Sequence, residues 1–461
     1  MPQIEQYDAI VIGSGQGGIP MAKYLAEKEM QTALIEEKHI GGTCINTGCT
    51  PTKTMVASAK SALEARRAKE YGVHISDVSV DLKEVIARKN DVVNSFREGQ
   101  YESLTGTNHL DLIEGKARFT DKKTIIVVLN DGGERLLKAD KIFINTGART
   151  LVPPIDGLDQ IEWYDNRTIM ELDGVPSHLL VIGGGYIGLE FGQMFHRFGS
   201  KVTVFHSGER ILDIEDEDIS EEMLKILEGE GLNIITNCKI NNIKREGDEV
   251  ILSGEGGGLS EDIRCSHVLL AVGRVPNTDD LDLKKTGVET DDKGYVQVNE
   301  RLETSVEGIY AIGDVKGGPQ FTHVSYNDYV VLKKNLFEDG NVSTDDRILT
   351  YTVFTDPQLG RVGLNEQQAK DQNIAYQVAK MPMESVARAY ETSHTQGFMK
   401  ALIDKKTGAI LGASILGMEG GEIASALLLA MMGGVTAQQI RDMAIAHPTL
   451  MESLNNLFAE I

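Results

Sequence analysis

The sequence predicts an α/β protein built around two copies of one strand–turn–helix unit. Residues 7–27 and residues 179–199 each run from an apolar stretch, through three spaced glycines, into an amphipathic stretch. Each of these glycines in the second copy lies 170 residues after its counterpart, as Gly183 does after Gly13. A second apolar stretch follows each copy, at 32–37 and at 201–206. This repetition indicates two domains of the same kind.

The glycines give each copy the means to hold a nucleotide. They permit a tight turn and a close backbone approach to a pyrophosphate, which the N–H groups and positive end of the following helix can bind. One such fingerprint is weak evidence, but two in the strand–turn–helix context are strong. We therefore expect two Rossmann-like dinucleotide-binding domains, with Gly13, Gly15 and Gly18 in the first and Gly183, Gly185 and Gly188 in the second.

The residue that closes the second strand differs between the copies. Glu36 lies 21 residues after the second glycine and can accept hydrogen bonds from an adenosine ribose. The same offset in the second copy falls on His206, with Arg210 nearby. No carboxylate there repels a ribose 2′-phosphate, so the second site favours NADPH over NADH, although NADH stays open. The alternative is that the helix differs by one residue and Glu209 takes the carboxylate role.

Two dinucleotide sites in one chain suggest a relay, in which one cofactor stays bound and the other exchanges. A resident flavin usually needs contacts from distant chain segments. Residues 304–317 offer one, because this apolar strand ends in Gly313 and Asp314, where a carboxylate can hold a polyol chain. Alone, these two residues after a strand are an ordinary turn signal.

Cys44 and Cys49 directly follow the first nucleotide unit. Pro51 suits the first turn of a helix, so Cys49 falls at a helix N-terminus, where the dipole favours a thiolate. In a regular helix, residues five apart rise about 7–8 Å, so a disulfide requires a distorted first turn, which Gly48 permits.

A metal site and a purely structural role are the two alternatives for this cysteine pair. A metal site would need a second Cys/His pair at zinc-like spacing nearby, and two unpaired structural cysteines would have no link to the nucleotide fold upstream. We favour a redox-active disulfide and expect no metal. Cys238 and Cys265 lie on or near strands of the second domain, and we interpret both as structural.

Composition excludes several classes of function. The net charge is −23, from 69 acidic and 46 basic residues, which disfavours nucleic acid and anionic lipid as partners. The most apolar stretch, residues 424–435, is too short to span a bilayer and predicts a buried helix. Four cysteines in 461 residues form no disulfide framework, and the N-terminus does not resemble a signal peptide. We therefore expect a cytoplasmic protein.

Eight motifs along the chain resemble those of one enzyme family. The chain resembles the class I pyridine nucleotide–disulfide oxidoreductases, which include glutathione reductase, dihydrolipoyl dehydrogenase and mercuric reductase. The motifs that carry the resemblance are GSGQGG, GGTCINTGCTPTK (41–53), INTGART (144–150), GGGYIGLE, AVGRVPNT (271–278), YAIGDV (310–315), TDPQLGRVG (355–363) and AHPTLME (446–452). The resemblance implies an FAD domain in two parts, 1–150 and 276–347, an NAD(P)H domain at 151–275, and a C-terminal α+β dimerisation domain at 348–461.

The family's roles transfer residue by residue. Cys49 resembles the thiol that faces the flavin, and Cys44 the interchange thiol that meets substrate. Lys53 and Glu190 resemble the ion pair beside the flavin, and Tyr186 the tyrosine that shields it. Asp314 resembles the carboxylate that holds the FAD ribitol. The motif positions add Thr43, Lys53, Thr146, Gly147 and Gly273 as cofactor-binding residues.

His447 and Glu452 resemble an acid–base pair that reaches across a homodimer to the partner's disulfide. Pro448 suits the start of a helix, which would leave His447 just outside the first turn and Glu452 on the helix. The carboxylate would then orient the imidazole. The resemblance thus implies an active site shared between subunits.

Motif residues that some family members have and this sequence lacks reduce the number of possible substrates. No cysteine follows Cys265, whereas mercuric reductases and large thioredoxin reductases use a C-terminal cysteine pair. Dihydrolipoyl dehydrogenases typically read His-x-His-Pro-Thr, and here Ile445 precedes Ala446 and His447. The sequence of the cysteine motif, CINTGCTPTKT, most resembles that of a bacterial mercuric reductase-like group, which is similar to hypothiocyanous acid reductases. We expect an FAD-dependent NAD(P)H reductase of a small disulfide or thiol-reactive oxidant; dihydrolipoyl dehydrogenase, mercuric reductase and a flavoprotein redox sensor are the alternatives.

Overall fold

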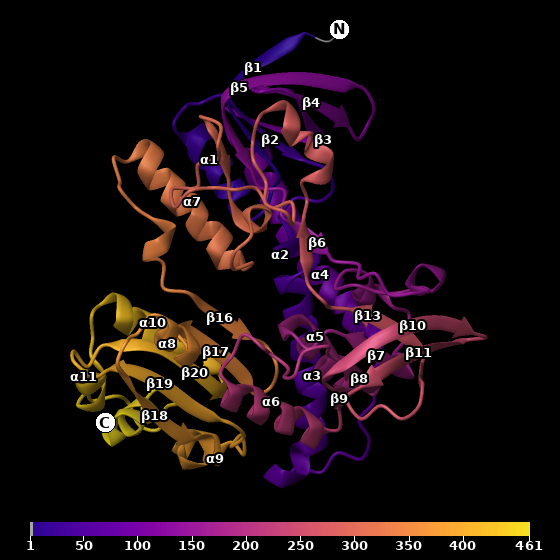
Figure 1. Ribbon diagram of the computed structural model, residues 1–461, viewed down its shortest axis with the longest axis vertical. Coiled ribbons are helices and arrows are strands. Elements are labelled where there is room, and N and C mark those ends of the chain that lie inside the picture. Colours follow the sequence, from indigo (N-terminus) through magenta and orange to yellow (C-terminus); the bar gives the residue numbers. More distant parts are fainter. Residues whose placement is uncertain (1–2) are drawn as a thin grey trace. The chain divides into compact units, whose positions relative to one another are not determined.

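The structure is a computed structural model that describes residues 3–461, and its chain forms two compact units (Figure 1). Unit 1 combines Met1–Met55, Lys83–Leu151 and Gly273–Arg347. Unit 2 combines Val56–Leu82, Val152–Val272 and Ile348–Ile461. Each unit is therefore assembled from three separate stretches of the chain.

Unit 1 contains the first nucleotide-binding fingerprint. Its strands are β1 (Ile4–Ile12), β2 (Thr32–Glu36), β3 (Leu110–Asp121), β4 (Thr124–Leu129), β5 (Glu134–Ile144), β6 (Ala148–Thr150), β14 (Arg274–Pro276) and β15 (Ile309–Ala311). Its helices are α1 (Gly18–Glu27), α2 (Gly42–Asn46), α4 (Leu82–Thr105) from its second residue on, α7 (Thr322–Phe337) and the first turns of α3 (Cys49–Arg67).

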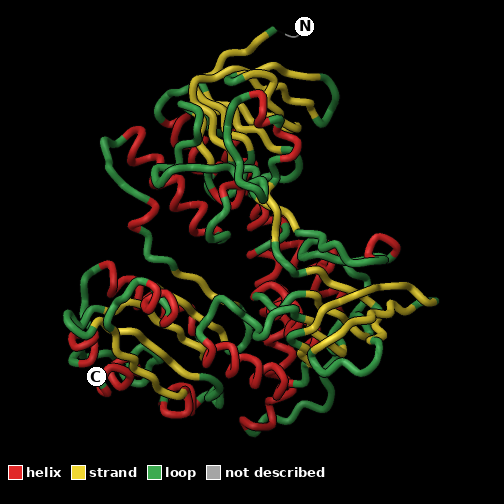
Figure 2. Tube along the Cα trace, in the orientation of Figure 1, coloured by secondary structure: helices red, strands yellow, loops and turns green. Residues whose placement is uncertain are grey.

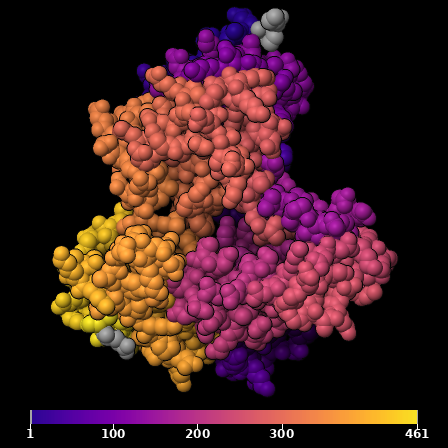
Figure 3. All heavy atoms as spheres, in the orientation of Figure 1, coloured from indigo at the N-terminus to yellow at the C-terminus, as the bar shows by residue number. Residues whose placement is uncertain are grey.

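The main sheet of unit 1 is parallel at its centre. β1 pairs in parallel with both β2 and β5, β3 extends the sheet beyond β2, and β15 extends it beyond β5. β4 pairs antiparallel with β3 and β5. α1 and α7 pack together on this sheet (Figure 2). The ring centroids of Tyr24 on α1 and Tyr329 on α7 lie 6.4 Å apart. In the view of Figure 3, the Gly273–Arg347 stretch covers much of the visible face of the unit.

Unit 2 contains the second fingerprint and the C-terminal region. Its strands are β7 (His178–Ile182), β8 (Lys201–Phe205), β9 (Asn233–Ile235), β10 (Cys238–Glu246), β11 (Glu249–Gly256), β12 (Ile263–Cys265), β13 (His267–Leu270), β16 (Thr350–Val353), β17 (Gln358–Gly363), β18 (Tyr376–Pro382), β19 (Phe398–Asp404) and β20 (Ile410–Gly417). Its helices are α5 (Tyr186–Phe198), α6 (Glu217–Glu230), α8 (Glu366–Asp371), α9 (Ala387–Glu391), α10 (Gly420–Met432), α11 (Ala437–Arg441), α12 (Ser453–Leu457) and the remainder of α3.

Three sheets organise unit 2. The parallel sheet β13-β7-β8-β9 contains the fingerprint. Strands β10, β11 and β12, which lie between β9 and β13 in the sequence, form a separate antiparallel sheet. The C-terminal region forms the antiparallel sheet β16-β17-β20-β19-β18. Cys238 and Cys265 are each only 2% exposed within one apolar core, which confirms that both are buried in the fold.

The two fingerprints repeat in atomic detail. Ile12 pairs with Ile35 in the first copy, and Ile182 pairs with Phe205 in the second, at the same 170-residue offset. Both copies run strand, glycine turn, helix, parallel strand, as the sequence predicts. The α/β fold class, with two nucleotide-binding units and a C-terminal α+β region, is confirmed.

One expectation about the C-terminal region is wrong. Residues 424–432 of the apolar stretch at 424–435 lie in helix α10 (Gly420–Met432), but the helix is not buried all round. Ile423 and Leu427 lie in the apolar core, whereas Leu429 and Met432 are each 71% exposed. The apolar residues therefore cover two faces of the helix, and only one of them packs on the sheet. None of the helices within residues 3–461 is both long and apolar enough to cross a membrane.

Candidate active site

The first glycine turn is packed so closely that side chains are excluded. Gly13 has φ +100°, and a Cβ there would lie 2.3 Å from the carbonyl oxygen of Asn145. A Cβ on Gly18 would lie 2.1 Å from the carbonyl oxygen of Gly13. The N-terminus of α1 thus approaches the end of β1 without any side chain between them. This is the geometry that a pyrophosphate requires for contact with backbone N–H groups.

Glu36 organises the same turn from the end of β2. Its Oε2 accepts hydrogen bonds from the Ser14 backbone N–H (3.0 Å) and the Ser14 hydroxyl (2.6 Å). Ser14 Oγ in turn accepts from the Gly41 N–H at 3.1 Å. Glu36 therefore links the nucleotide turn to the loop that leads to Cys44. A carboxylate at this place fits the ribose of a dinucleotide.

Asn145 is a functional residue that the sequence reasoning missed. It is 6% exposed; its Oδ1 accepts from the Gly18 N–H at 3.0 Å and its Nδ2 donates to the Ile312 carbonyl at 2.8 Å. It thereby joins the N-terminus of α1 to the strand that leads to Asp314. Its place inside the INTGART motif, beside Thr146 and Gly147, was the available signal.

Two segments of unit 1 that are distant in the sequence contact each other at Thr146, Gly147 and Gly273. Thr146 Oγ1 donates to the Asn277 carbonyl at 2.8 Å, and the Asn277 N–H donates to the Gly147 carbonyl at 2.9 Å. The Gly273 carbonyl accepts from the Leu151 N–H at 3.0 Å. These contacts bring the INTGART and AVGRVPNT motifs together, as β6 and β14 pair between them.

The second glycine turn has the same construction in unit 2. A Cβ on Gly183 would lie 2.3 Å from the Ala271 carbonyl oxygen, and a Cβ on Gly188 would lie 2.0 Å from the Gly183 carbonyl oxygen. A Cβ on Gly185 would meet nothing within 4 Å, so the backbone is open to a ligand at this point. The residues of both turns therefore fit dinucleotides.

His206 takes the position of Glu36 in the second copy, but in a different chemical form. Its Nδ1 accepts the Gly184 N–H at 3.2 Å, just as Glu36 accepts the N–H of the equivalent residue Ser14. The accepting Nδ1 carries no proton, so the ring proton sits on Nε2, which is buried without a hydrogen-bond partner among the described residues. In this arrangement the His206 ring supports the turn through Nδ1.

Arg210 is then the cation that flanks this turn. Its side chain is 37% exposed, and its ion-pair partner is Glu217, whose Oε1 lies 3.5 Å away. Such an exposed, loosely paired guanidinium remains available to an anion. Arg210 thus adds a positive charge to a region where the sequence reasoning rested on the absence of a carboxylate.

The two cysteines lie on two different helices rather than along one. Cys44 is on α2 and Cys49 is the first residue of α3, which confirms the predicted helix start. Gly48 lies in the short segment between the two helices, and a Cβ there would lie 2.9 Å from the Thr43 carbonyl oxygen. No disulfide joins the two cysteines in this structure, in which Cys44 is half-buried and Cys49 is exposed.

The polar neighbours of the pair distinguish the two thiols. A hydrogen bond with Cys49 and burial raise the pKa of Cys44 strongly, although Thr322 and Lys53 oppose this rise. Cys49 Sγ lies 3.1 Å from the hydroxyl of Thr322, the first residue of α7. In the reduced pair, Cys44 is therefore the thiol that is harder to ionise. Thr322 was not singled out from the sequence, because it lies 273 residues from Cys49.

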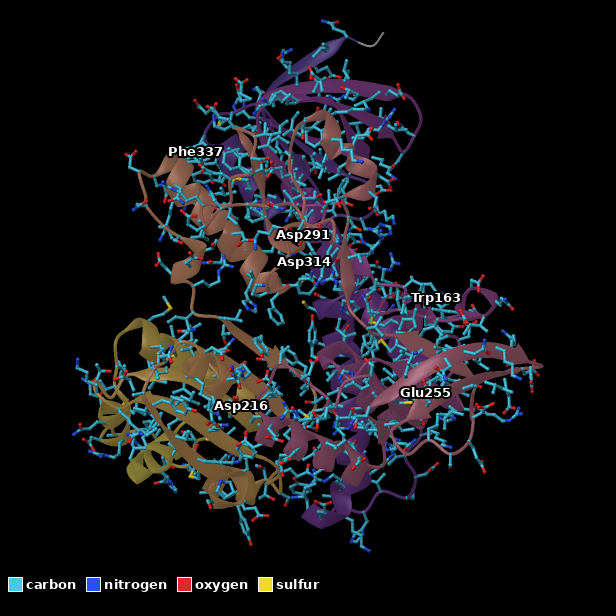
Figure 4. The ribbon with its side chains drawn as sticks, viewed as in Figure 1. Trp163, Asp216, Glu255, Asp291, Asp314 and Phe337 are labelled. Atoms are coloured by element: carbon cyan, nitrogen blue, oxygen red, sulfur yellow. The ribbon has the colours of Figure 1, made fainter. Side chains whose placement is uncertain are left out.

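Asp314 follows β15 in unit 1 (Figure 4). Its Oδ2 accepts a hydrogen bond from Arg274 Nη1 at 2.6 Å, and both side chains are 17% exposed. Arg274 also donates to the Ala148 carbonyl at 3.0 Å. Arg274 is a further residue that the sequence reasoning missed, although it stands in the AVGRVPNT motif. The charge pair holds the Asp314 carboxylate in one orientation.

Lys53 and Glu190 belong to different units, so their pairing beside a flavin stays a prediction. Glu190 is 3% exposed on α5, and its Oε1 accepts the Phe354 N–H at 2.8 Å. Tyr186 is the first residue of α5, directly after the glycine turn. That position suits a side chain that meets a nicotinamide.

His447 and Glu452 form the expected pair. Glu452 Oε2 lies 2.7 Å from His447 Nδ1, and the His447 side chain is 67% exposed. The carboxylate fixes the proton on Nδ1, which leaves Nε2 directed away from this contact.

The expected helix that starts at Pro448 is wrong. Residues 448–452 form turns, α12 begins at Ser453, and the His447–Pro448 peptide bond is cis. Side chain–backbone bonds replace the first helical turn, including Thr449 Oγ1 to the Ala446 carbonyl at 2.8 Å and the Glu452 N–H to Thr449 Oγ1 at 3.2 Å. Glu452 therefore precedes the helix rather than lying on it.

Among the residues that the structure describes, no group of three or more His, Cys, Asp or Glu side chains is arranged to hold a metal ion. The polar groups of the candidate site instead surround two nucleotide turns and one thiol pair. These features define a class of enzyme that passes electrons from a pyridine nucleotide through a flavin to a disulfide.

Comparison with known families agrees with this class. The family described as "Pyridine nucleotide-disulphide oxidoreductase" matches residues 7–328, and its "dimerisation domain" matches residues 349–458. The chain belongs to the pyridine nucleotide–disulfide oxidoreductase family and is an oxidoreductase. Membership implies a flavoprotein that uses FAD and a pyridine nucleotide.

Individual relatives extend over nearly the whole chain. It is 37% identical over 460 residues to the "Probable pyridine nucleotide-disulfide oxidoreductase RclA" of Escherichia coli K12, covering 99% of each protein. It is 33% identical to a mercuric reductase of Bacillus cereus, covering 97% of this chain and 70% of that protein. It is 34% identical to a dihydrolipoyl dehydrogenase of Haloferax volcanii, covering 97% and 94%.

Solved structures give the same result. The chain superposes on a structure described as a "Cu(II) complex of HOCl-induced flavoprotein disulfide reductase RclA from Escherichia coli" with a TM-score of 0.91. The two share 36% sequence identity, and the match covers 99% of this chain and 100% of that one. A second structure of the same protein, without copper in its description, gives a TM-score of 0.89.

Proposed function

We propose that this chain is an FAD-dependent, NADPH-driven reductase of a small disulfide or a thiol-reactive oxidant. Electrons leave through Cys44 and Cys49. The observation that supports the proposal is the asymmetry of the thiol pair, in which Cys49 contacts Thr322 and the pKa of Cys44 is raised by its hydrogen bond with Cys49 and by burial. A dithiol of this kind can deliver two electrons to an acceptor and return as a disulfide.

The proposed division into domains follows the sequence motifs. FAD is held by residues 1–150 and 276–347, the pyridine nucleotide by 151–275, and dimer contacts by 348–461. Gly13, Gly15, Gly18 and Glu36 support the adenosine end of FAD, and Asp314 supports its ribitol. The flavin supplies the transfer of a hydride equivalent from nicotinamide to the disulfide.

The substrate step uses the two thiols in turn. With a disulfide substrate, Cys44 gives its proton to a general base and attacks one sulfur as a thiolate, forming a mixed disulfide and releasing the other half as a thiolate. Cys49 then attacks Cys44, which releases the second half and restores the Cys44–Cys49 disulfide. Two thiols are formed for each protein dithiol oxidised, so atoms and electrons balance. A general acid is needed to protonate the leaving thiolates.

We propose that His447 of the partner subunit supplies this proton in a homodimer. Its Nδ1 is held by Glu452, and the side chain is exposed rather than packed within its own chain. The exposed Leu429 and Met432 on α10 support a subunit interface, since apolar side chains of this size seldom face water as neighbours. The match to a dimerisation domain supports the same arrangement.

NADPH is the proposed reductant, because Arg210 is available to a 2′-phosphate and no carboxylate occupies the position of His206. The strongly negative net charge supports a small-molecule substrate rather than nucleic acid or a membrane. Because four cysteines form no structural disulfide framework, we propose that the enzyme works in the cytoplasm.

A second candidate is reduction of a metal ion. It is favoured by the relatives whose descriptions name mercuric reductase and Cu(II). Against a mercuric role, the sequence has no cysteine after Cys265. Dihydrolipoyl dehydrogenase is a third candidate, and a redox sensor that does not turn over is a fourth.

The experiment that separates these candidates is a substrate panel. Purified enzyme is mixed with small disulfides, lipoamide, Hg(II), Cu(II) and hypohalous-type oxidants, and consumption of NADPH and NADH is followed. We expect fast turnover with a disulfide or oxidant and NADPH. Fast NAD-dependent lipoamide turnover would establish the dihydrolipoyl dehydrogenase function instead, and no turnover with any acceptor would leave the sensor function.

A further inference from the structure

Asp328 is a fully buried carboxylate that the proposed chemistry does not use. It lies in the middle of α7 with 0% of its surface exposed. Its Oδ1 accepts from Arg347 Nη2 at 2.6 Å, and Lys316 Nζ lies 3.4 Å from its Oδ2. Two cations thus surround one carboxylate. Burying a charged carboxylate costs free energy. Proteins in which apolar residues replace a buried ion pair are often as stable as the original. Stability alone therefore does not account for Asp328.

A further contact of Asp328 explains its position. Its Oδ2 accepts the backbone N–H of Gly313 at 2.8 Å, in a fully buried hydrogen bond. Gly313 has φ +73°, and a Cβ there would lie 2.7 Å from Ser325 Oγ, so this residue is confined on its other side as well. The Asp328 carboxylate thus provides the acceptor for a backbone donor that water cannot reach.

The turn that precedes Asp314 is therefore fixed at several successive groups. The Ile312 N–H donates to the Ile144 carbonyl at 3.0 Å, and the Ile312 carbonyl accepts from Asn145 Nδ2 at 2.8 Å. Gly313 is held by Asp328, and the Asp314 side chain is held by Arg274. This leaves Asp314 Oδ1, the oxygen not bonded to Arg274, in a set direction.

We propose that Asp328 is a positioning residue for the flavin. By accepting the Gly313 N–H, it fixes the turn that aims the Asp314 carboxylate at a ribitol hydroxyl. The inference rests on the FAD contact proposed for Asp314. It assigns a cofactor-retention role to a residue that touches no cofactor, on a helix that begins after the Asp314 turn has ended.

The test compares two double variants that remove the same charges. In D328L/R347M, no acceptor remains for the Gly313 N–H. In D328N/R347M, the amide oxygen can still accept it. Holoenzyme is diluted, and the release of FAD is followed by its fluorescence, while unfolding is followed by far-UV circular dichroism. If D328L/R347M does not fold, D328V/R347M makes the same comparison.

We expect D328L/R347M to release FAD roughly 10-fold faster or more than D328N/R347M, because a buried donor is left unsatisfied. The asparagine variant should stay near the wild-type rate. D165N is a control, because Asp165 is also buried but bonds to Arg167 and Thr168 in unit 2. It should lower the unfolding temperature without changing FAD release. Equal release rates in the two double variants would overturn the inference. A wild-type protein that holds no FAD would instead overturn the proposed function.

Discussion

At the scale of single residues, the two thiols have different neighbours, and we therefore propose different roles for them. Cys49 begins α3 and lies 3.1 Å from the Thr322 hydroxyl, whereas the pKa of Cys44 is raised by its hydrogen bond with Cys49 and by burial. A thiolate at Cys49 next to an oxidised flavin would produce a long-wavelength charge-transfer band. The band is therefore a direct report on which thiol carries the charge.

We expect this band to appear when the enzyme is partly reduced with NADPH or dithionite. Cys49→Ser should abolish it, and Cys44→Ser should show it without any reduction. Thr322→Val should weaken it, because the hydroxyl that contacts Cys49 is lost. Absorbance titration measures all three variants. A band that survives in Cys49→Ser would show that the thiols are assigned in the wrong order.

The nucleotide preference also depends on single residues. His206 supports the glycine turn through Nδ1, and Arg210 is the group that we expect to distinguish a 2′-phosphate. Arg210→Gln should lower kcat/KM for NADPH by roughly 10-fold or more and leave NADH within about 2-fold. His206→Glu should keep this support, as Glu36 does, and shift preference toward NADH by about 1–3 kcal/mol.

Initial rates with both nucleotides measure this preference. Lys225→Gln is a matched control, since Lys225 is an exposed cation on the neighbouring helix α6. It should leave both values unchanged. A wild-type enzyme with a strong preference for NADH would contradict the role given to Arg210.

At the scale of elements, a buried lysine joins the nucleotide-binding part of unit 2 to its C-terminal sheet. Lys400 on β19 is 1% exposed and contacts Asp216 and Asp218 at the start of α6, each at 2.9 Å, and Glu366 on α8 at 2.5 Å. Burial alone would raise the pKa of Asp218, but hydrogen bonds from Lys380 and Lys400 lower it below its ordinary value. Burial would also raise the pKa of Glu366, but hydrogen bonds from Lys400 and Tyr376 lower it below its ordinary value.

These depressed pKa values give a signed prediction for stability. A carboxyl group with a lowered folded pKa adds stability above its ordinary pKa, near 4, and this stability is lost as pH falls through the folded value. Lys400→Met should lower the free energy of unfolding by about 3–5 kcal/mol at neutral pH, because three carboxylates lose the one buried cation that they share. The difference from wild type should shrink as pH falls below about 4.

Thermal unfolding at a series of pH values measures this effect. Lys244→Met is the control, because its pair with Glu246 is exposed on β10 and should contribute within about 0.5 kcal/mol. A Lys400→Met effect of the same size at every pH would show that packing rather than charge accounts for the role of Lys400.

How far the sequence predicts these elements depends on where each interaction lies. The glycine turns, the start of α3 and both nucleotide-binding units follow from local patterns, because glycine spacing and apolar strands act over short stretches. The turn at 448–452 does not, since Thr449 and Glu452 use side chain–backbone bonds in place of a helix. The partners Thr322 and Asn145 are also beyond such patterns, because their contacts join residues more than 100 positions apart.

At the scale of the whole molecule, the proposed active site requires two chains. Leu429 and Met432 are exposed apolar residues, and the His447 side chain faces outward although Glu452 orients it. Both features are explained if Cys44 and Cys49 of one subunit meet His447 of the partner subunit. His447→Ala should then slow substrate reduction by roughly 10²–10⁴-fold, while reduction of the flavin by NADPH stays near the wild-type rate. Glu452→Gln should have a milder effect of the same kind.

The decisive measurement for a site shared between subunits is the activity of a mixed dimer. One subunit carries His447→Ala and the other carries Cys44→Ser, and each parent homodimer is inactive or nearly so. In the heterodimer, one site combines both defects, and the other combines an intact cysteine pair with an intact histidine. We expect substrate reduction to reappear in the purified heterodimer. A confirmed heterodimer without activity would contradict the shared site and place His447 outside the chemistry.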